Sequence, residues 1–289
     1  MSLTVFTILR DTFKRFNSDK CWNSAIVISY FAFLCSVPVV SLFIYATTKI
    51  IGSSEFALRS LNVFTDEFFA KLDPSFFVRL QDISQAVNNL GWFGLIGSLV
   101  SASFLFSNLI YTINMIFRAK YERSFVYNRL IEYSIMFAMG IILLISLAIT
   151  ASWTALHRAL QTSAFVAEHL NPRAVGLVDN FLIQYLAPLA LTFLAFFTLY
   201  KFIPEVKVFT RSAVAAAVIS AVLWEAFKRV FAFYVANFSA IGIVLSKLVQ
   251  GTLTSIIFFL LWITFSLVIL LWGAELAAVL NERRHAKKA

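Results

Sequence analysis

The stretch SAVAAAVISAVLWEAFKRVFAFYVA, residues 212–236, decides the fold class of this protein. It is long and apolar enough to cross a bilayer, because a spanning helix needs about 20 mostly apolar residues. Yet it carries Glu225, Lys228 and Arg229 within five positions. Each charged side chain costs roughly 2.5–3.5 kcal/mol at a bilayer centre on insertion scales. A membrane helix that keeps three charges needs a structural or functional reason for them.

The composition of the whole chain agrees with a membrane location. Of its 289 residues, 60% are hydrophobic and only 13% are charged, whereas a soluble domain is about half apolar and a quarter charged. Too few charged residues are present to cover a surface that faces water. The apolar runs are continuous and do not alternate, which favours helices over strands. We therefore predict an all-α integral membrane protein with one polytopic domain, residues 1–289.

Six apolar runs are long enough to span a bilayer. The predicted spans are 25–50, 91–117, 133–156, 179–203, 212–236 and 253–280. Short amphipathic helices are predicted outside them: residues 3–17 on the inner membrane surface, two in the external loop 52–90 around Pro74, and one at 157–171. The longest loop, 52–90, is expected to cap the bundle on the outside.

The basic residues orient the spans, because cytoplasmic loops carry an excess of Lys and Arg. Of the 24 basic residues, counting along the six-span topology puts 15 on the side of both termini and 7 on the other. The remaining two are Lys228 and Arg229. Both termini are therefore predicted to be cytoplasmic, with anionic lipid headgroups as neighbours of the basic loops. The net charge of +9 then requires no nucleic acid partner.

Two readings of the charged cluster remain open. Glu225 lies near the middle of its span, and the offsets of three and four place it beside Lys228 and Arg229, so it can pair with either cation. One acid against two bases leaves a local excess of about one positive charge. The cluster is either a buried ion pair that braces the helices or the wall of a polar cavity, which is the default function of ionisable residues inside a membrane.

Other polar residues fall on the first two spans. Gly97, Ser101, Asn108 and Tyr111 form one stripe of the second span, which either serves helix packing or lines the same cavity. In the first span, Pro38 frees the carbonyl of Leu34 and kinks the helix, and Tyr30 and Ser36 can approach that opening.

The sequence shows no other recognisable chemistry. Cys21 and Cys35 lie on one helical run about 21 Å apart, too far for a disulfide. The three His residues have no paired spacing for a metal, and no phosphate-binding glycine loop is present. We therefore predict no cofactor, no metal, no catalytic residue and no enzymatic activity.

Several motifs, in one order over nearly the whole chain, resemble the YihY/BrkB family of bacterial inner-membrane proteins. They are SAIVISYFAFLCSVPVV at 25–41, LIYTINMIF at 109–117, KFIPEVKV at 201–208, LWEAFKRVFAFYVANFSAIG at 223–242 and LLWITFSLVILLWGAEL at 260–276. The resemblance highlights Tyr30, Ser36, Pro38, Asn114, Pro204, Lys228, Tyr234, Trp262, Gly273 and Glu275. It implies a six-helix protein of the bacterial inner membrane. Family members have been labelled ribonuclease BN, but the short cytoplasmic loops and the lack of a metal cluster argue against a nuclease.

Two functions compete on these observations. The first is a transporter-like protein that moves an anionic solute or anionic lipid through a cavity lined by Glu225, Lys228, Arg229, Asn108, Ser101 and Tyr30. The second is a non-catalytic assembly or structural factor of the envelope that acts through loop 52–90. Neither the substrate nor a homo-oligomeric state can be read from the sequence.

Overall fold

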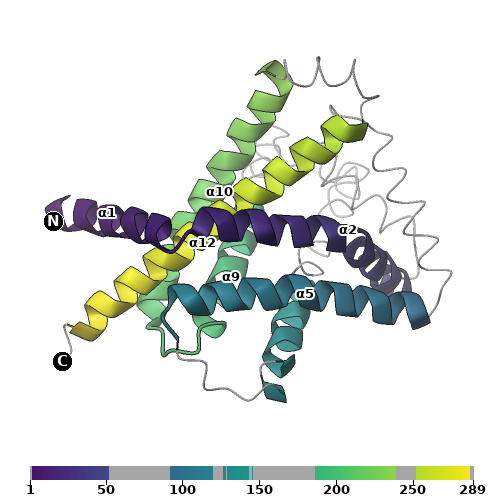
Figure 1. Cartoon of the computed structure of the whole chain (residues 1–289), viewed down its shortest axis with the longest axis horizontal. Helices are drawn as coiled ribbons and strands as arrows, with labels where there is room; N and C mark the ends of the chain where they lie inside the picture. The colour runs from purple at the N-terminus through teal and green to yellow at the C-terminus, as the bar shows by residue number, and fades with distance from the viewer. Residues whose placement is uncertain are drawn as a thin grey trace, which may run out of the picture.

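A computed structural model of the chain describes residues 2–51, 92–119, 126–127, 129–142, 145, 186–238 and 252–286. Within these residues the protein is helical and has no strand, so the all-α prediction is confirmed there. The helices are α1 (Ser2–Ser18), α2 (Cys21–Ile51), α5 (Trp92–Ile116), α9 (Ala187–Phe202), α10 (Thr210–Phe238) and α12 (Thr252–Ala286) (Figure 1). A further helical stretch covers residues 129–142.

Every predicted span contains helix in its described part. Among the described residues, one segment, Ile256–Ala286, is long and apolar enough to cross a membrane, and 22% of its most apolar window is buried inside the protein. Shorter apolar helices cover Cys21–Ser36, Val100–Ile116 and Pro188–Phe202. The count of six crossings therefore stays a prediction. The predicted helices of loop 52–90 and of 157–171 lie outside the described residues.

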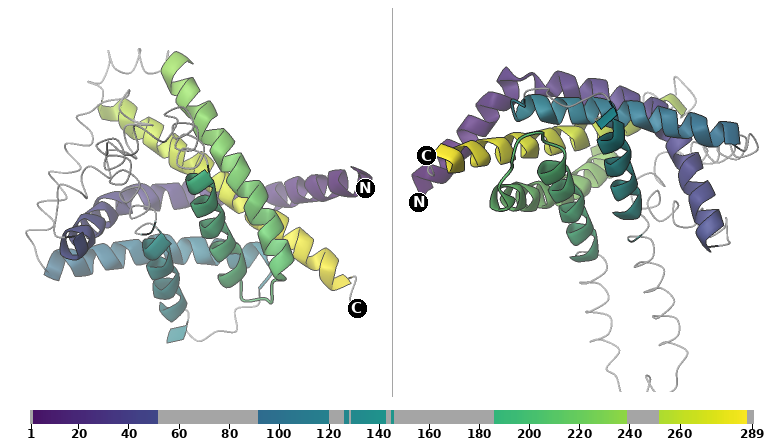
Figure 2. Two further views of the ribbon diagram at one scale, coloured as in Figure 1. Left: turned by 180° about the vertical axis from the view of Figure 1, so that it is seen from behind. Right: turned by 90° about the horizontal axis from the view of Figure 1, so that it is seen from below.

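The amphipathic helix predicted for residues 3–17 is present as α1. Phe6 and Phe13 are exposed on it, whereas Phe16 is buried near its end. Lys20 then adopts a left-handed backbone conformation with φ 53°. This conformation ends a helix and turns the chain, and α2 starts at the next residue. The turn makes a corner between α1 and α2 (Figure 2, right).

Helix α12 is the centre of the described bundle. It packs against α2, α10 and α1, while α2 also packs along α5 and α10 along α9. Helix α2 continues through Pro38 and bends in its second half (Figure 2). The first and last helices end on the same side of the molecule, so the two termini lie near each other in all three views (Figures 1 and 2).

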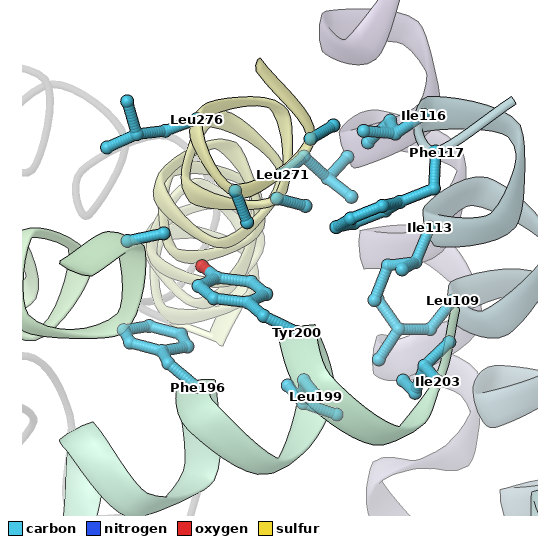
Figure 3. Close-up of a cluster of buried hydrophobic side chains, with 14 of the residues drawn as sticks. Leu109, Ile113, Ile116, Phe117, Phe196, Leu199, Tyr200, Ile203, Leu271 and Leu276 are labelled. Atoms are coloured by element: carbon cyan, nitrogen blue, oxygen red, sulfur yellow. The ribbon is translucent and has the colours of Figure 1, made fainter. Parts of the chain in front are cut away.

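Small residues let these helices approach closely, as is typical of membrane helix packing. On α10 the buried positions include Ala213, Ala216 and Ala217, and on α12 Ala274, Ala277 and Ala278 are buried. Larger side chains from three elements fill the space around them (Figure 3). They are Leu109, Ile113, Ile116 and Phe117 at α5, Phe196, Leu199, Tyr200 and Ile203 at α9, and Leu271 and Leu276 on α12.

Candidate functional site

The charged cluster of α10 is an ion pair within one helix. Lys228 Nζ lies 2.6 Å from Glu225 Oε1, and the side chains are 18% and 17% exposed. Arg229 is exposed. Of the two cations that the spacing offered to Glu225, Lys228 is thus the one in the i, i+3 ion pair. The pair is half-buried in the protein and lies in the middle of an apolar helix.

The aromatic side chains beside this pair connect α10 to α12. Trp262 of α12 lies with its ring centroid 5.3 Å from that of Trp224, 5.1 Å from that of Phe227 and 5.2 Å from that of Phe231. Trp262, which the family resemblance highlighted, therefore belongs to an aromatic cluster between the two helices. Tyr234, one turn further along α10, is 37% exposed.

The predicted polar stripe of the second span lies mostly on the outside of the described helices. Gly97 is exposed with no atom within 4 Å of a built Cβ, and Tyr111 is 59% exposed. The Asn108 amide donates to the Phe104 carbonyl of its own helix at 2.8 Å. The half-buried Ser101 offers its carbonyl to the Cys35 thiol at 2.8 Å. The stripe thus has local and packing contacts.

Two highlighted residues of the first span, Tyr30 and Ser36, are likewise exposed or bonded within their own helix. Tyr30 is 57% exposed, and the Ser36 hydroxyl donates to the Phe33 carbonyl of its own helix at 2.7 Å. Cys21 and Cys35 are both free and buried, as the distance argument predicted. Helix α5 packs on α2, whereas the Glu225–Lys228 pair lies on α10, which packs on α9 and α12.

Two buried asparagines hold the loop between α9 and α10, residues 203–209. Asn114 of α5 accepts a hydrogen bond from the Glu205 backbone N–H at 2.8 Å. Asn281 of α12 accepts one from the Phe209 N–H at 2.8 Å and donates to the Lys207 carbonyl at 3.3 Å. Their exposed fractions are 1% and 5%. We call these two residues the asparagine clamp.

The clamp explains part of the KFIPEVKV motif. Pro204, which has no N–H to satisfy, is buried inside the clamped loop, and the Lys201 ammonium donates to the Val208 carbonyl. Asn114 was singled out from the sequence, but Asn281 was not. Its only signal was an uncharged polar residue at the end of the last apolar run, next to a basic tail.

Gly273 is required by the crossing of α9, α10 and α12. A Cβ there would lie 1.9 Å from Ser220 Oγ and 2.2 Å from the Tyr200 hydroxyl. That hydroxyl is hydrogen-bonded to the Leu270 carbonyl at 2.8 Å and lies 3.1 Å from Ser220 Oγ. The Tyr200 ring points from α9 toward α12 (Figure 3). Only glycine leaves room for this hydroxyl.

Glu275 is fully buried, two residues beyond this crossing. The Cys21 thiol at the start of α2 donates to Glu275 Oε1 at 3.6 Å, and the carboxyl of Asp19 lies within hydrogen-bonding reach. The Lys207 carbonyl faces Asn281 and His285, further along α12.

Asp19 is held by a second left-handed residue. Arg118 has φ 54° and ends α5, and its guanidinium lies 2.8 Å from Asp19 Oδ1. The Asp19 side chain is 6% exposed and that of Arg118 is 53% exposed. Non-glycine residues rarely adopt this backbone region, so two such residues at facing helix ends indicate that the ion pair is built into the fold.

Two ion pairs join α1 to the end of α12. Arg15 binds Glu282 with both guanidinium nitrogens, at 2.8 and 2.5 Å, and Arg283 binds Asp11 at 2.6 Å. The hydrogen bond to Glu282 raises the pKa of Arg15 further above its ordinary value, so Arg15 is cationic at every physiological pH. Among the described residues, no group of three or more His, Cys, Asp or Glu side chains could hold a metal ion.

Fold and sequence together define a class, a helical membrane protein, and comparison with known proteins gives the family. Residues 12–289 match the family Virulence factor BrkB. A UPF0761 membrane protein of Alteromonas mediterranea is 30% identical over 97% of this chain and 91% of its own length. The corresponding protein of Vibrio campbellii is 27% identical over 94% of this chain and 81% of its own.

A third relative is longer than this chain. The UPF0761 membrane protein of Acinetobacter baylyi is 27% identical over 96% of this chain, which spans 63% of that protein. No solved structure matches the chain. The chain belongs to the BrkB family of membrane proteins, which confirms the resemblance noted in the sequence.

Proposed function

We propose that the chain is a non-enzymatic transport protein of the bacterial inner membrane, and that it moves an anionic solute or an anionic lipid. One observation carries the proposal: a half-buried ion pair, Glu225–Lys228, lies midway along the apolar helix α10 with a second cation, Arg229, one position further on. An ionisable group kept at membrane depth is by default a functional group. Two cations against one acid favour an anionic ligand.

The orientation in the proposal has both termini in the cytoplasm. Two observations support it. The basic residues concentrate on the side of the termini along the predicted topology, and the two ends of the chain lie at the same end of the structure (Figure 1). An even number of crossings requires that arrangement.

In the proposed mechanism the three charges of α10 have different roles. Lys228 and Arg229 attract the anion. Glu225 holds Lys228 in place between transport events, since the two opposite charges lie 2.6 Å apart when no anion is bound. An approaching anion competes with Glu225 for Lys228, which keeps the cation from binding the anion too tightly to release it.

The test is a flux assay in proteoliposomes with two probes. Inorganic phosphate inside the vesicles reports a solute path, and a fluorescent phosphatidylglycerol that is bleached only in the outer leaflet reports a lipid path. Lys228→Gln with Arg229→Gln is expected to abolish the flux of the probe that the parent moves. Lys14→Gln, which removes one exposed cation from α1, is the matched control and is expected to retain it.

A double variant separates transport from bracing. Glu225→Gln with Lys228→Gln removes both charges together and leaves no unpaired ion behind. If this variant folds and moves the probe at the rate of the parent, the pair is only a brace and the proposal fails. If it folds and flux is lost, the charges themselves serve transport. Failure of the parent to move either probe also contradicts the proposal.

A further inference from the structure

Two buried carboxyls from opposite ends of the chain meet where the turn between α1 and α2 lies on α12 (Figure 1). Asp19 belongs to that turn and Glu275 to α12, and their carboxyls lie within hydrogen-bonding reach of each other. Glu275 is fully buried, and the Asp19 side chain is 6% exposed. We call these two residues the carboxyl pair.

Each carboxyl has one oxygen with a donor and one without. Arg118 lies at 2.8 Å from Asp19 Oδ1, and the Cys21 thiol donates to Glu275 Oε1. The other two oxygens, Asp19 Oδ2 and Glu275 Oε2, are buried and have no hydrogen-bond partner. Buried acceptors without a donor are rare and costly, and here they belong to two carboxyls within hydrogen-bonding reach of each other.

Within the described part of the chain, the charges around the pair balance only if one carboxyl is neutral. Arg118 neutralises Asp19. Arg15 is the other described cation near Glu275, and its guanidinium is taken up by both carboxylate oxygens of Glu282. Two carboxylates in contact cannot both be ionised without strong repulsion. Tyr200 of α9 and Ser220 of α10 also face α12, about one turn before Glu275. The Tyr200 hydroxyl there donates to the Leu270 carbonyl.

We propose that the carboxyl pair is a proton-binding site, in which Glu275 carries a proton on Oε2 and donates it to Asp19 Oδ2. This single proton gives both orphan oxygens a partner and removes the repulsion. It also ties the corner between α1 and α2 to α12, so release of the proton loosens that contact. The inference does not depend on the proposed transport function.

A proton fits the site better than a metal cation. The pair supplies only two free oxygens, whereas hard cations take six or more oxygen ligands. Arg118 lies in direct contact with Asp19 and repels a second cation. The Cys21 thiol, as a donor, points its hydrogen at Glu275 Oε1, where a metal would need a lone pair.

Infrared spectroscopy of the full-length protein in lipid nanodiscs tests the proposal directly. The parent is expected to show the C=O stretching band of a buried protonated carboxyl at neutral pH, and to lose it reversibly at alkaline pH. Glu275→Gln is expected to lose the whole band. Asp19→Asn is also expected to lose it at neutral pH, because the amide can donate to an ionised Glu275. Glu225→Gln, which changes a carboxylate paired with a cation, is the matched control and should retain the band.

Stability gives a second readout. At neutral pH the folded pair holds a proton that an exposed Glu in the unfolded chain has released, so stability falls as pH rises. The unfolding temperature of the parent should therefore drop from neutral to alkaline pH. That of Glu275→Gln should change less, because glutamine mimics the protonated acid.

Three outcomes would overturn the proposal. The first is a parent spectrum without the band at neutral pH. The second is a band that survives in Glu275→Gln. The third is an unfolding temperature that rises on addition of Na⁺, Mg²⁺ or Ca²⁺ in the parent and not in Glu275→Gln, which would make the ligand a cation. If Glu275→Gln fails to fold, the alkaline titration of the parent band still decides, since a band unchanged by pH contradicts the site.

Discussion

The charged residues of α10 and the polar residues at the end of α12 are both charged or polar groups within an apolar helix bundle. They differ in where they find their partners. Glu225 and Lys228 lie three residues apart on one helix and pair with each other. Asp19, Cys21, Glu275 and the asparagine clamp belong to segments far apart in the sequence, and each depends on another helix for its partner. The first arrangement can change without moving a helix, whereas the second cannot.

This difference suggests a division of labour. A self-contained pair that is half-buried and flanked by Arg229 can exchange partners with a ligand. Polar groups that join α5, α9, α10 and α12 fix the positions of those helices, because each buried hydrogen bond is lost if the helices separate. The following predictions, ordered from the largest expected effect to the smallest, test that contrast.

Gly273→Ala is expected to have the largest effect on folding. The new methyl group would lie 1.9 Å from Ser220 Oγ and 2.2 Å from the Tyr200 hydroxyl, so α9 or α10 must move away from α12. Overpacking costs about 1–3 kcal/mol, and we expect the upper end because the hydrogen bond from Tyr200 to Leu270 is also lost. The measurement is the unfolding temperature in detergent, followed by tryptophan fluorescence.

The control for this substitution is Gly97→Ala. No atom lies within 4 Å of a Cβ at Gly97. Replacing a glycine inside a helix by alanine raises the free energy of unfolding by roughly 0.5–1 kcal/mol. The same change should thus destabilise α12 and stabilise α5. Equal unfolding temperatures for the two variants would contradict the close crossing at Gly273.

Asn114→Leu is expected to have the second largest effect. It leaves the half-buried Glu205 N–H without its acceptor, and an unsatisfied donor costs up to about 1–3 kcal/mol when it is buried. The loop 203–209 should also become more open, which limited proteolysis after Lys201 or Lys207 would detect. Asn108→Leu is the matched control, since the Asn108 amide donates only to a carbonyl of its own helix. A loss of stability as large in the control would contradict the role of the clamp.

The sequence predicted the charged pair of α10 better than the polar contacts at the end of α12. The reason is the distance along the chain between the partners. Apolar run length predicted the helices, and the offsets of three and four predicted that Glu225 pairs with Lys228 or Arg229, of which the structure shows the pair with Lys228. Asp19 and Glu275, or Asn281 and the loop it clamps, come together only after the helices have packed. Asn281 and Asp19 therefore looked like ordinary residues at helix ends. The sequence also predicted the polar stripe on the second span, but it did not predict which way that stripe faces relative to the other helices.

Lys228→Met is expected to have an intermediate effect on folding. It leaves Glu225 without the ammonium at 2.6 Å. Breaking a buried ion pair costs about 3–5 kcal/mol, whereas an exposed pair is worth about 0–1 kcal/mol. The side chains are 18% and 17% exposed, which lies between these two cases, so we expect a cost of about 1–2 kcal/mol. Adding Glu225→Gln should restore most of the lost stability, and a double variant less stable than Lys228→Met would contradict pairing within α10.

Glu282→Gln is expected to have the smallest effect. It weakens the bond from Arg15 that ties α1 to the end of α12, but the two side chains are 33% and 48% exposed. Exposed ion pairs contribute about 0–1 kcal/mol and are screened by salt. The unfolding temperature should thus change little, and less still at high ionic strength. A loss as large as that of Asn114→Leu would show that surface charges, and not the buried polar contacts, hold α1 and α12 together.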